Sequence, residues 1–122
     1  MAVVKLGRPV KSNLGGGNGA MAYIINPAKT DGGRLVSSNY ERTRTDYDAL
    51  AEGMLDDNRR SPKGIWKDSR LAYHIKLSFS PKDPVTPEQV HELGVEFARR
   101  ITGGEYKFVV ATHTDRHHLH DH

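Results

Sequence analysis

Alternating apolar and polar residues predict two β-strands in the second half of the chain. Within Leu71–Phe79 every second residue is large and apolar, and the residues between are Ala72, His74, Lys76 and Ser78. A period of two predicts a strand with one face in the core. Segment 106–112 (YKFVVAT) is β-branched and aromatic and predicts a second strand, which we expect to run antiparallel to the first around the helix that joins them.

The joining helix has clear ends. Thr86 is a suitable N-cap, Pro87 suits the first helical position and Gln89 completes a capping box. Gly103 and Gly104 are expected to end the helix. Its predicted buried stripe has helical spacing and consists of Val90, Leu93, Phe97 and Ile101.

A further helix is predicted from Asp46 to about Asn58, with Thr45 as its N-cap. The apolar residues that recur there at helical spacing are Tyr47, Leu50, Met54 and Leu55. Residues 28–44 and 59–68 are polar or basic, and we expect both to be surface loops.

The first 19 residues show no apolar period. They are rich in Gly, Asn and Lys, so we expect a basic, glycine-rich N-terminal arm, either flexible or a short edge strand followed by a loop. The short apolar segment 20–26 (AMAYIIN) follows, and Pro27 ends it. Residues 20–122 are expected to form one domain, because a chain of this length buries one modest core.

Composition narrows the classes of protein further. The chain has 122 residues, no cysteine, 18 Lys or Arg and 15 Asp or Glu, which gives a net charge of +3. Without cysteine, a metal would be held by nitrogen and oxygen ligands. Neither a signal peptide nor a stretch of ~20 apolar residues is present, so we expect a soluble, cytoplasmic protein with no membrane partner. The small positive charge permits a polyanionic partner.

The last ten residues, HTDRHHLHDH, form a histidine cluster. If segment 118–122 is a strand, His118, His120 and His122 project to one face, where two imidazoles two residues apart can meet one ion. His113 ends the preceding predicted strand, and a hairpin would bring it back beside His120. We therefore expect His113, His120 and His122 to hold a divalent metal ion, with positions left open for oxygen ligands as in a catalytic site.

Two other interpretations of the cluster compete with a functional site, namely an engineered affinity tail and a surface tract that chelates metals without a role. The histidines are interrupted and follow directly on a predicted strand, which favours a functional site. Asp115 or Asp121 could orient a ligand ring from behind. We expect His117 and His118 to be bystanders.

The spacing H-x-D-x-x-x-x-H-x-H, from His113 to His122, resembles the third motif of plasmid relaxases, also called mobilization nucleases. The resemblance extends to LAYHIKLSFSP, VTPEQVHELGVEFARRI and KFVVATHTD in the same order, and upstream to AYIINPAKT. It covers roughly residues 20–122 and implies the N-terminal part of a nuclease domain of the histidine-hydrophobic-histidine superfamily. The implied fold is α+β, with a central antiparallel sheet flanked by helices. Relaxases continue beyond this motif, so we expect a domain incomplete at its C-terminus.

The resemblance also implies an activity. Relaxases are metal-dependent, site-specific endonucleases and transesterases that nick one DNA strand at a plasmid origin of transfer, through a 5′-phosphotyrosine, in mobilization and conjugation. Mg²⁺ or Mn²⁺ is then the expected ion, and single-stranded DNA and other relaxosome proteins are the expected partners. Two alternatives stay open, a non-catalytic DNA-binding fragment of a relaxase and a metal-binding protein with no nucleic-acid role.

Individual residues take roles from the same resemblance. Tyr23 stands at the family's nucleophile position, against the alternative of an aromatic ring packed on a short helix, and Tyr40 is the reserve candidate. Ser78 matches the second motif and is expected to contact DNA near the nick, whereas His74 on the same face is excluded from the metal ligands. Further candidates for DNA contacts lie in basic loops: Arg42, Arg44, Lys63 and Trp66.

Overall fold

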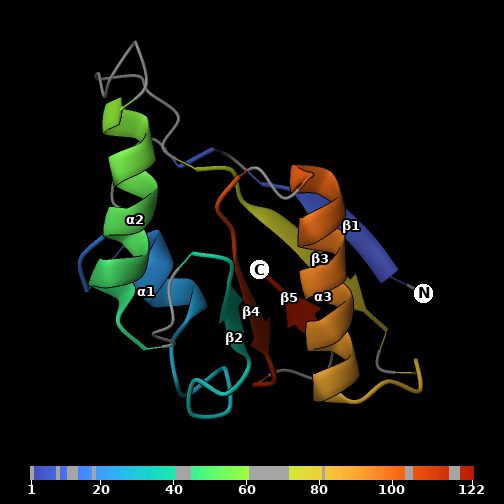
Figure 1. The fold of residues 1–122 in the computed structure, drawn as a ribbon. Helices are drawn as coiled ribbons and strands as arrows, with labels where there is room; N and C mark the ends of the chain where they lie inside the picture. The colour runs from blue at the N-terminus through green and yellow to red at the C-terminus, as the bar shows by residue number, and fades with distance from the viewer. Residues whose placement is uncertain are drawn as a thin grey trace.

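The computed structural model describes residues 2–7, 9–10, 14–17, 19–40, 45–60, 72–80, 82–103, 106–115 and 119–122. The elements found in these ranges (Figure 1) are β1 (Ala2–Leu6), α1 (Ala20–Ile24), β2 (Val36–Ser38), α2 (Tyr47–Arg60), β3 (Ile75–Phe79), α3 (Pro87–Thr102), β4 (Val109–His113) and β5 (His120–Asp121). None of the described helices is long and apolar enough to cross a membrane.

The strands form one sheet in the order β1-β3-β5-β4-β2, and every neighbouring pair is antiparallel. The predicted α+β fold with a central antiparallel sheet is therefore confirmed. The predicted relation between β3 and β4 is wrong, because β5 lies between them and pairs antiparallel with both. β3 and β4 consequently run parallel, with α3 as the crossover between them (Figure 1).

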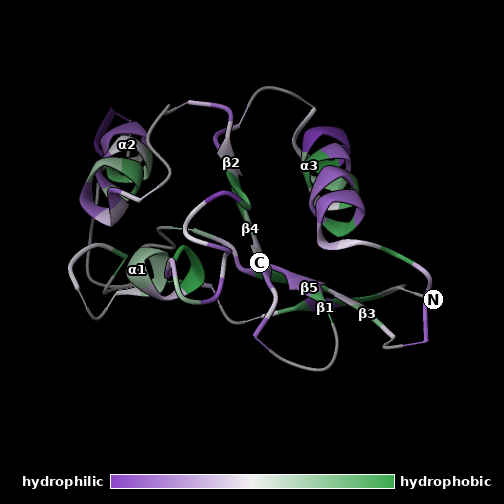
Figure 2. Ribbon diagram, turned by 90° about the horizontal axis from the view of Figure 1, so that it is seen from below, coloured by the Kyte–Doolittle hydropathy of each residue, from purple (hydrophilic) through white to green (hydrophobic). Residues whose placement is uncertain are grey.

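Helices cover both sides of the sheet. In Figure 2, α3 lies over one face of β3, β4 and β5, while α1 and α2 lie on the other side. Leu77 and Phe79 of β3 pack with Val90 of α3 in one buried cluster. A second cluster joins α1 and α2 to the opposite face, and its buried members are Leu14, Met21, Ile25, Val36, Leu50, Ala51 and Ala111.

The buried face of α3 differs from the predicted stripe. Val90 is buried as expected, but the other buried positions are Gly94 and Ala98, whereas Leu93 and Ile101 are about half exposed. The two small residues let the helix axis approach the sheet closely, so side-chain size rather than hydrophobicity selects this face. The predicted ends of α3 are confirmed by the capping box and by a left-handed Gly103.

The start of α2 also differs by one residue from its prediction. The Asp46 carboxylate, not Thr45, accepts a hydrogen bond from the Ala49 amide at 3.1 Å and so caps the helix. Asp48 lies in the first turn as expected, and its carboxylate accepts a second hydrogen bond from the Gly16 amide. The helix is therefore held to the preceding loop at its N-terminus.

Two short strands complete the sheet at its edges. Of the two structures left open for the first residues, β1 is the edge strand, paired with β3 from Ala2↔Phe79 to Leu6↔Ile75. The prediction of a loop over residues 28–44 is wrong at β2, which pairs with β4. Three residues are too few to show an alternating pattern, so only the pairing reveals this strand. The division of the chain after residue 19 stays a prediction.

Candidate metal centre

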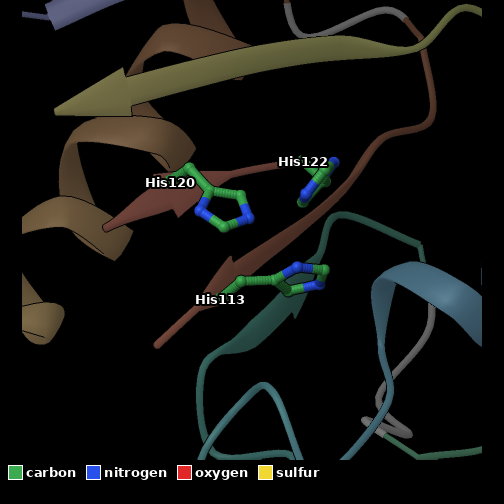
Figure 3. A group of neighbouring side chains, drawn as sticks. All are labelled: His113, His120 and His122. Atoms are coloured by element: carbon green, nitrogen blue, oxygen red, sulfur yellow. The ribbon is translucent and has the colours of Figure 1, made fainter. Parts of the chain in front are cut away.

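Three histidines converge where β4 ends and β5 begins. His113 pairs with His120 across the two strands, which confirms the predicted return of the chain. His122 continues the pairing through two backbone hydrogen bonds with Ala111, at 3.0 and 2.8 Å. All three side chains point toward one another (Figure 3), and one nitrogen of each lies within 4.8 Å of the others. This histidine triad, His113, His120 and His122, has the donor set of a metal site.

Specific contacts hold the rings of His113 and His122. The Ile24 carbonyl can only accept, so His113 Nε2 donates to it at 2.8 Å and Nδ1 keeps the lone pair. His122 Nδ1 lies 2.8 Å from His74 Nε2, while its own Nε2 is buried and has no hydrogen-bond partner among the described residues. An ion bound at this nitrogen would satisfy a buried polar atom that is otherwise unpaired.

Burial favours the neutral form of two rings of the triad, those of His113 and His122. Burial lowers the pKa of His113, and burial together with the neighbouring histidines lowers the pKa of His122 to about 2. A cation needs the imidazole lone pair, so neutral rings are the form that binds it. The residues present therefore fit a divalent ion held by three imidazoles.

Tyr23 lies beside two rings of the triad. Its ring, on α1, is 5.9 Å from the His113 ring and 6.0 Å from the His122 ring, centroid to centroid. Tyr23 is 50% exposed, so part of the residue is open to solvent. Lys29 Nζ lies 4.3 Å from the centroid of the same ring. The structure thus brings together the phenol and the histidines that the sequence singled out.

The other predicted site residues differ in how close they lie to the triad, and some lie outside the described residues. Ser78 is half-buried on β3 and pairs with His120 in the strand register, so it stands beside the triad. Asp115 is exposed and acts on His113 through its charge, which raises the pKa of that ring. The predicted DNA contacts that lie outside the described residues are Arg42, Arg44, Lys63 and Trp66.

Tyr40, the reserve nucleophile, is engaged elsewhere. Its hydroxyl donates to the Leu50 carbonyl of α2, and Lys107 lies over its ring at 5.3 Å from the centroid. A Cβ on Gly53 would lie 2.5 Å from this ring, so the ring packs directly on the helix. Tyr40 therefore has a structural role in the contact between β2 and α2.

Sequence reasoning missed a buried chain of hydrogen bonds behind the triad. Asp121 points to the opposite face of β5 from His120 and is only 3% exposed. Thr112 donates its hydroxyl to Asp121, so it must accept from His91 Nδ1 at 2.9 Å; His91 Nε2 then accepts from Ser37 at 2.6 Å. The chain links β5, β4, α3 and β2. The alternation of β5 places Asp121 away from the histidines, and the carboxylate contacts Thr112 rather than a ring of the triad. It does not take the alternative role of orienting a ligand ring.

Comparison with known proteins gives one family over most of the chain. The family model described as the nuclease domain of MobA/VirD2-like relaxases matches residues 23–122. The group II intron-interrupted relaxase LtrB of Lactococcus lactis subsp. cremoris is 56% identical in an alignment 119 residues long; the match covers 82% of this chain and 21% of that protein. Protein rlx of Staphylococcus aureus is 41% identical over 56 residues, or 46% and 17% of the two chains. The chain thus spans about a fifth of the length of these curated relatives.

Solved structures share the fold. Two Mn-bound crystal structures of the MobM relaxase domain (MOBV; Mob_Pre) with plasmid pMV158 oriT DNA match with TM-scores of 0.62 and 0.57. Both cover 99% of this chain, and 67% and 66% of the MobM chain, at 18% and 23% sequence identity. At this level of identity the likeness establishes a relaxase-like fold.

Proposed function

Because this chain belongs to the MobA/VirD2-like family of relaxase nucleases, we propose that it nicks single-stranded DNA at a plasmid origin of transfer. The nick is a transesterification, in which Tyr23 becomes joined to the new 5′ end. The placement of the accessible Tyr23 ring against His113 and His122 supports this proposal most directly.

The reaction needs a nucleophile and a way to stabilise charge on the scissile phosphate. The Tyr23 hydroxyl oxygen forms a bond to phosphorus while the bond from phosphorus to the 3′ oxygen breaks. The phenol loses its proton to water, and the departing 3′ oxygen gains one. A divalent ion held by His113, His120 and His122 would polarise the phosphate and offset the charge on its oxygens.

The other residues of the site bind the DNA or adjust the charge around the histidines. We assign Ser78 to a hydrogen bond with a DNA phosphate near the nick, because it lies beside His120 on the same face. Asp115 contributes negative charge near His113. We take the ion to be Mg²⁺ or Mn²⁺, whose remaining positions suit phosphate and water oxygens. The partners are single-stranded DNA and other relaxosome proteins.

The proposal predicts a covalent adduct that depends on Tyr23. Single-stranded oligonucleotides from the DNA that flanks the gene are incubated with the protein and Mn²⁺, and the intact protein mass is measured. The wild type should gain a DNA-sized mass, and Tyr23→Phe should gain none, because phenylalanine keeps the ring but lacks the attacking oxygen. Binding of Mn²⁺ should be the same in both, since the ligands are untouched.

Tyr106→Phe is the matched control, because Tyr106 is an exposed tyrosine outside the triad, and it should form the adduct like the wild type. An adduct in Tyr23→Phe would assign the nucleophile to another residue. Salt-sensitive DNA binding without any adduct in the wild type would instead identify a DNA-binding fragment.

A further inference from the structure

Lys29 is held beside the triad by the backbone around it. Its carbonyl accepts a hydrogen bond from the Thr114 amide at 2.9 Å, which ties the segment after α1 to the residue next to His113. Its ammonium lies over the Tyr23 ring, and its charge lowers the pKa of His113. Lys29 therefore stands on the same side of the triad as Tyr23.

Lys76 approaches the triad from the opposite strand. The register Leu77↔Asp121 and Ser78↔His120 places Lys76 level with His122, on the face that carries the histidines. Its charge lowers the pKa of His74, His113 and His122. The side chain is half-buried. Lys29 and Lys76 thus flank the triad from two sides.

Neither lysine has a salt bridge to a described carboxylate, whereas Lys107 pairs with Asp57 at 3.0 Å. Two ammonium groups beside a site built for a cation are unfavourable, because like charges repel in a partly buried setting. An anion placed between the lysines and the ion would turn this repulsion into attraction. A phosphate oxygen has the charge and the acceptor geometry for that position.

We propose that Lys29 and Lys76 form a phosphate clamp, which binds the phosphodiester oxygens of single-stranded DNA against the histidine triad. The identity of the ligand rests on the proposed function. Lys29 binds on the side of Tyr23 and Lys76 on the side of His122, so the clamp aligns the strand across the site. The clamp also makes binding of the metal and of the phosphate mutually dependent.

The clamp has a signature that a purely structural role would not produce. Without DNA, Lys29→Gln and Lys76→Gln should each bind Mn²⁺ more tightly than the wild type, by about two- to fivefold, because a repulsive charge is lost. With a short oligodeoxythymidine present, the wild type should gain about tenfold in Mn²⁺ affinity. That gain should fall in each variant and vanish in the double variant. Isothermal titration calorimetry measures the Mn²⁺ affinity of all four proteins, with and without the oligonucleotide.

Lys5→Gln is the matched control, because Lys5 pairs with Lys76 in the sheet but lies on the edge strand, one strand further from the triad. It should behave like the wild type. The salt dependence of DNA binding should weaken by about 0.7 in log–log slope for each clamp lysine removed. Glutamine is uncharged and keeps the part of the aliphatic stem nearest the backbone, which limits the loss of packing.

Several outcomes would overturn the clamp. Weaker Mn²⁺ binding by the variants without DNA would show that the lysines only support the fold, as would an unchanged gain with DNA. A gain with inorganic phosphate but none with the oligonucleotide would assign the site to free anions. The adduct experiment is separate, because a wild type that shows the full coupling but forms no adduct refutes the proposed nicking and leaves the clamp standing.

Discussion

His74 contacts one of the proposed metal ligands without belonging to the triad itself. It was excluded from the metal set on the sequence, and the triad described above does not contain it. It nevertheless lies 2.8 Å from His122 Nδ1. If an ion took the lone pair of His122 Nε2, Nδ1 would carry the hydrogen and donate it to His74, which would fix the orientation of the His122 ring.

His74→Ala should therefore weaken Mn²⁺ binding by about 10- to 100-fold. His74→Gln should recover part of this loss, because the glutamine side-chain oxygen can accept the same hydrogen bond. Calorimetric titration gives the affinities, and urea unfolding of the metal-free variants checks that the fold is retained. Equal affinity in His74→Ala and the wild type would show that the contact does not orient His122.

At the level of single residues, the sequence predicts the site residues that belong to one motif or share one face of a strand. His113, His120 and His122 follow from one alternating strand and one turn. His74 and Lys29 could not be found this way, because each reaches the site through a contact with a residue far away in the sequence. Strand phase put His74 on the correct face but gave no distance to His122. Only the strand order, with β5 next to β3, brings them together.

β5 carries a carboxylate into the interior between the sheet and α3. Asp121 Oδ2 is buried without a hydrogen-bond partner among the described residues, and a Cβ on Gly94 would lie 2.3 Å from it. Burial raises the pKa of Asp121 to about 7, against an opposing effect of the hydrogen bond from Thr112. β5 thus presents His120 to the triad on one face and places a poorly solvated acid on the other.

The stability of the metal-free protein should reflect this acid. A folded-state pKa raised from 3.8 to about 7 means that the folded state holds the proton more tightly than the unfolded state. The contribution of Asp121 to the free energy of unfolding is therefore most favourable below about pH 4. It is lost progressively as the pH rises through about 7, by at most about 4 kcal/mol. Asp121→Asn removes this loss and keeps an acceptor for Thr112.

Urea unfolding with a chelator at pH 5 and pH 8 tests the prediction. Asp121→Asn should be more stable than the wild type at pH 8, and the difference should shrink at pH 5. The histidines act in the opposite direction, since the lowered pKa values of His113 and His122 make the folded state lose stability as the pH falls below about 6.5. The difference between variant and wild type isolates Asp121, and a difference that is constant with pH would refute the effect.

Element prediction succeeded where a segment contains its own signals. The capping box and the glycine end of α3, and the alternation of β3, are local and were recovered. The N-cap of α2 is local, but Thr45 and Asp46 are both suitable residues, and only the hydrogen bond to Ala49 selects Asp46. The strand β2 and the buried face of α3 depend on contacts with other elements. Val90, Gly94 and Ala98 form that face because the sheet lies close to the helix. A search for large hydrophobic residues at helical spacing does not select a glycine. The parallel relation of β3 and β4 likewise needs β5, whose return between them no local pattern encodes.

The whole molecule places the site at the boundary between its two cores. α3 and the apolar face of β3 form one cluster. The other consists of α1 and α2 with Val36 of β2 and Ala111 of β4. The triad lies on the side of the sheet that α1 covers. There the Ile24 carbonyl accepts a hydrogen bond from His113, and the Tyr23 ring contacts the rings of His113 and His122. Its ligands come from two strands and its nucleophile candidate from a helix about 90 residues earlier. The site therefore exists only when the sheet and α1 are assembled.

Metal binding should consequently stabilise the folded state as a whole. An ion that binds only the folded protein raises the free energy of unfolding by about 2.7 kcal/mol at a concentration 100 times Kd, which corresponds to an increase in melting temperature of about 10 °C for a domain of this size. Differential scanning calorimetry with Mn²⁺, reversed by a chelator, measures the shift. Tyr23→Phe should keep it, because its ligands are intact. His113→Ala should lose it, since two imidazoles from β5 alone do not link the strand to β4; an equal shift in His113→Ala would place the ion outside the triad.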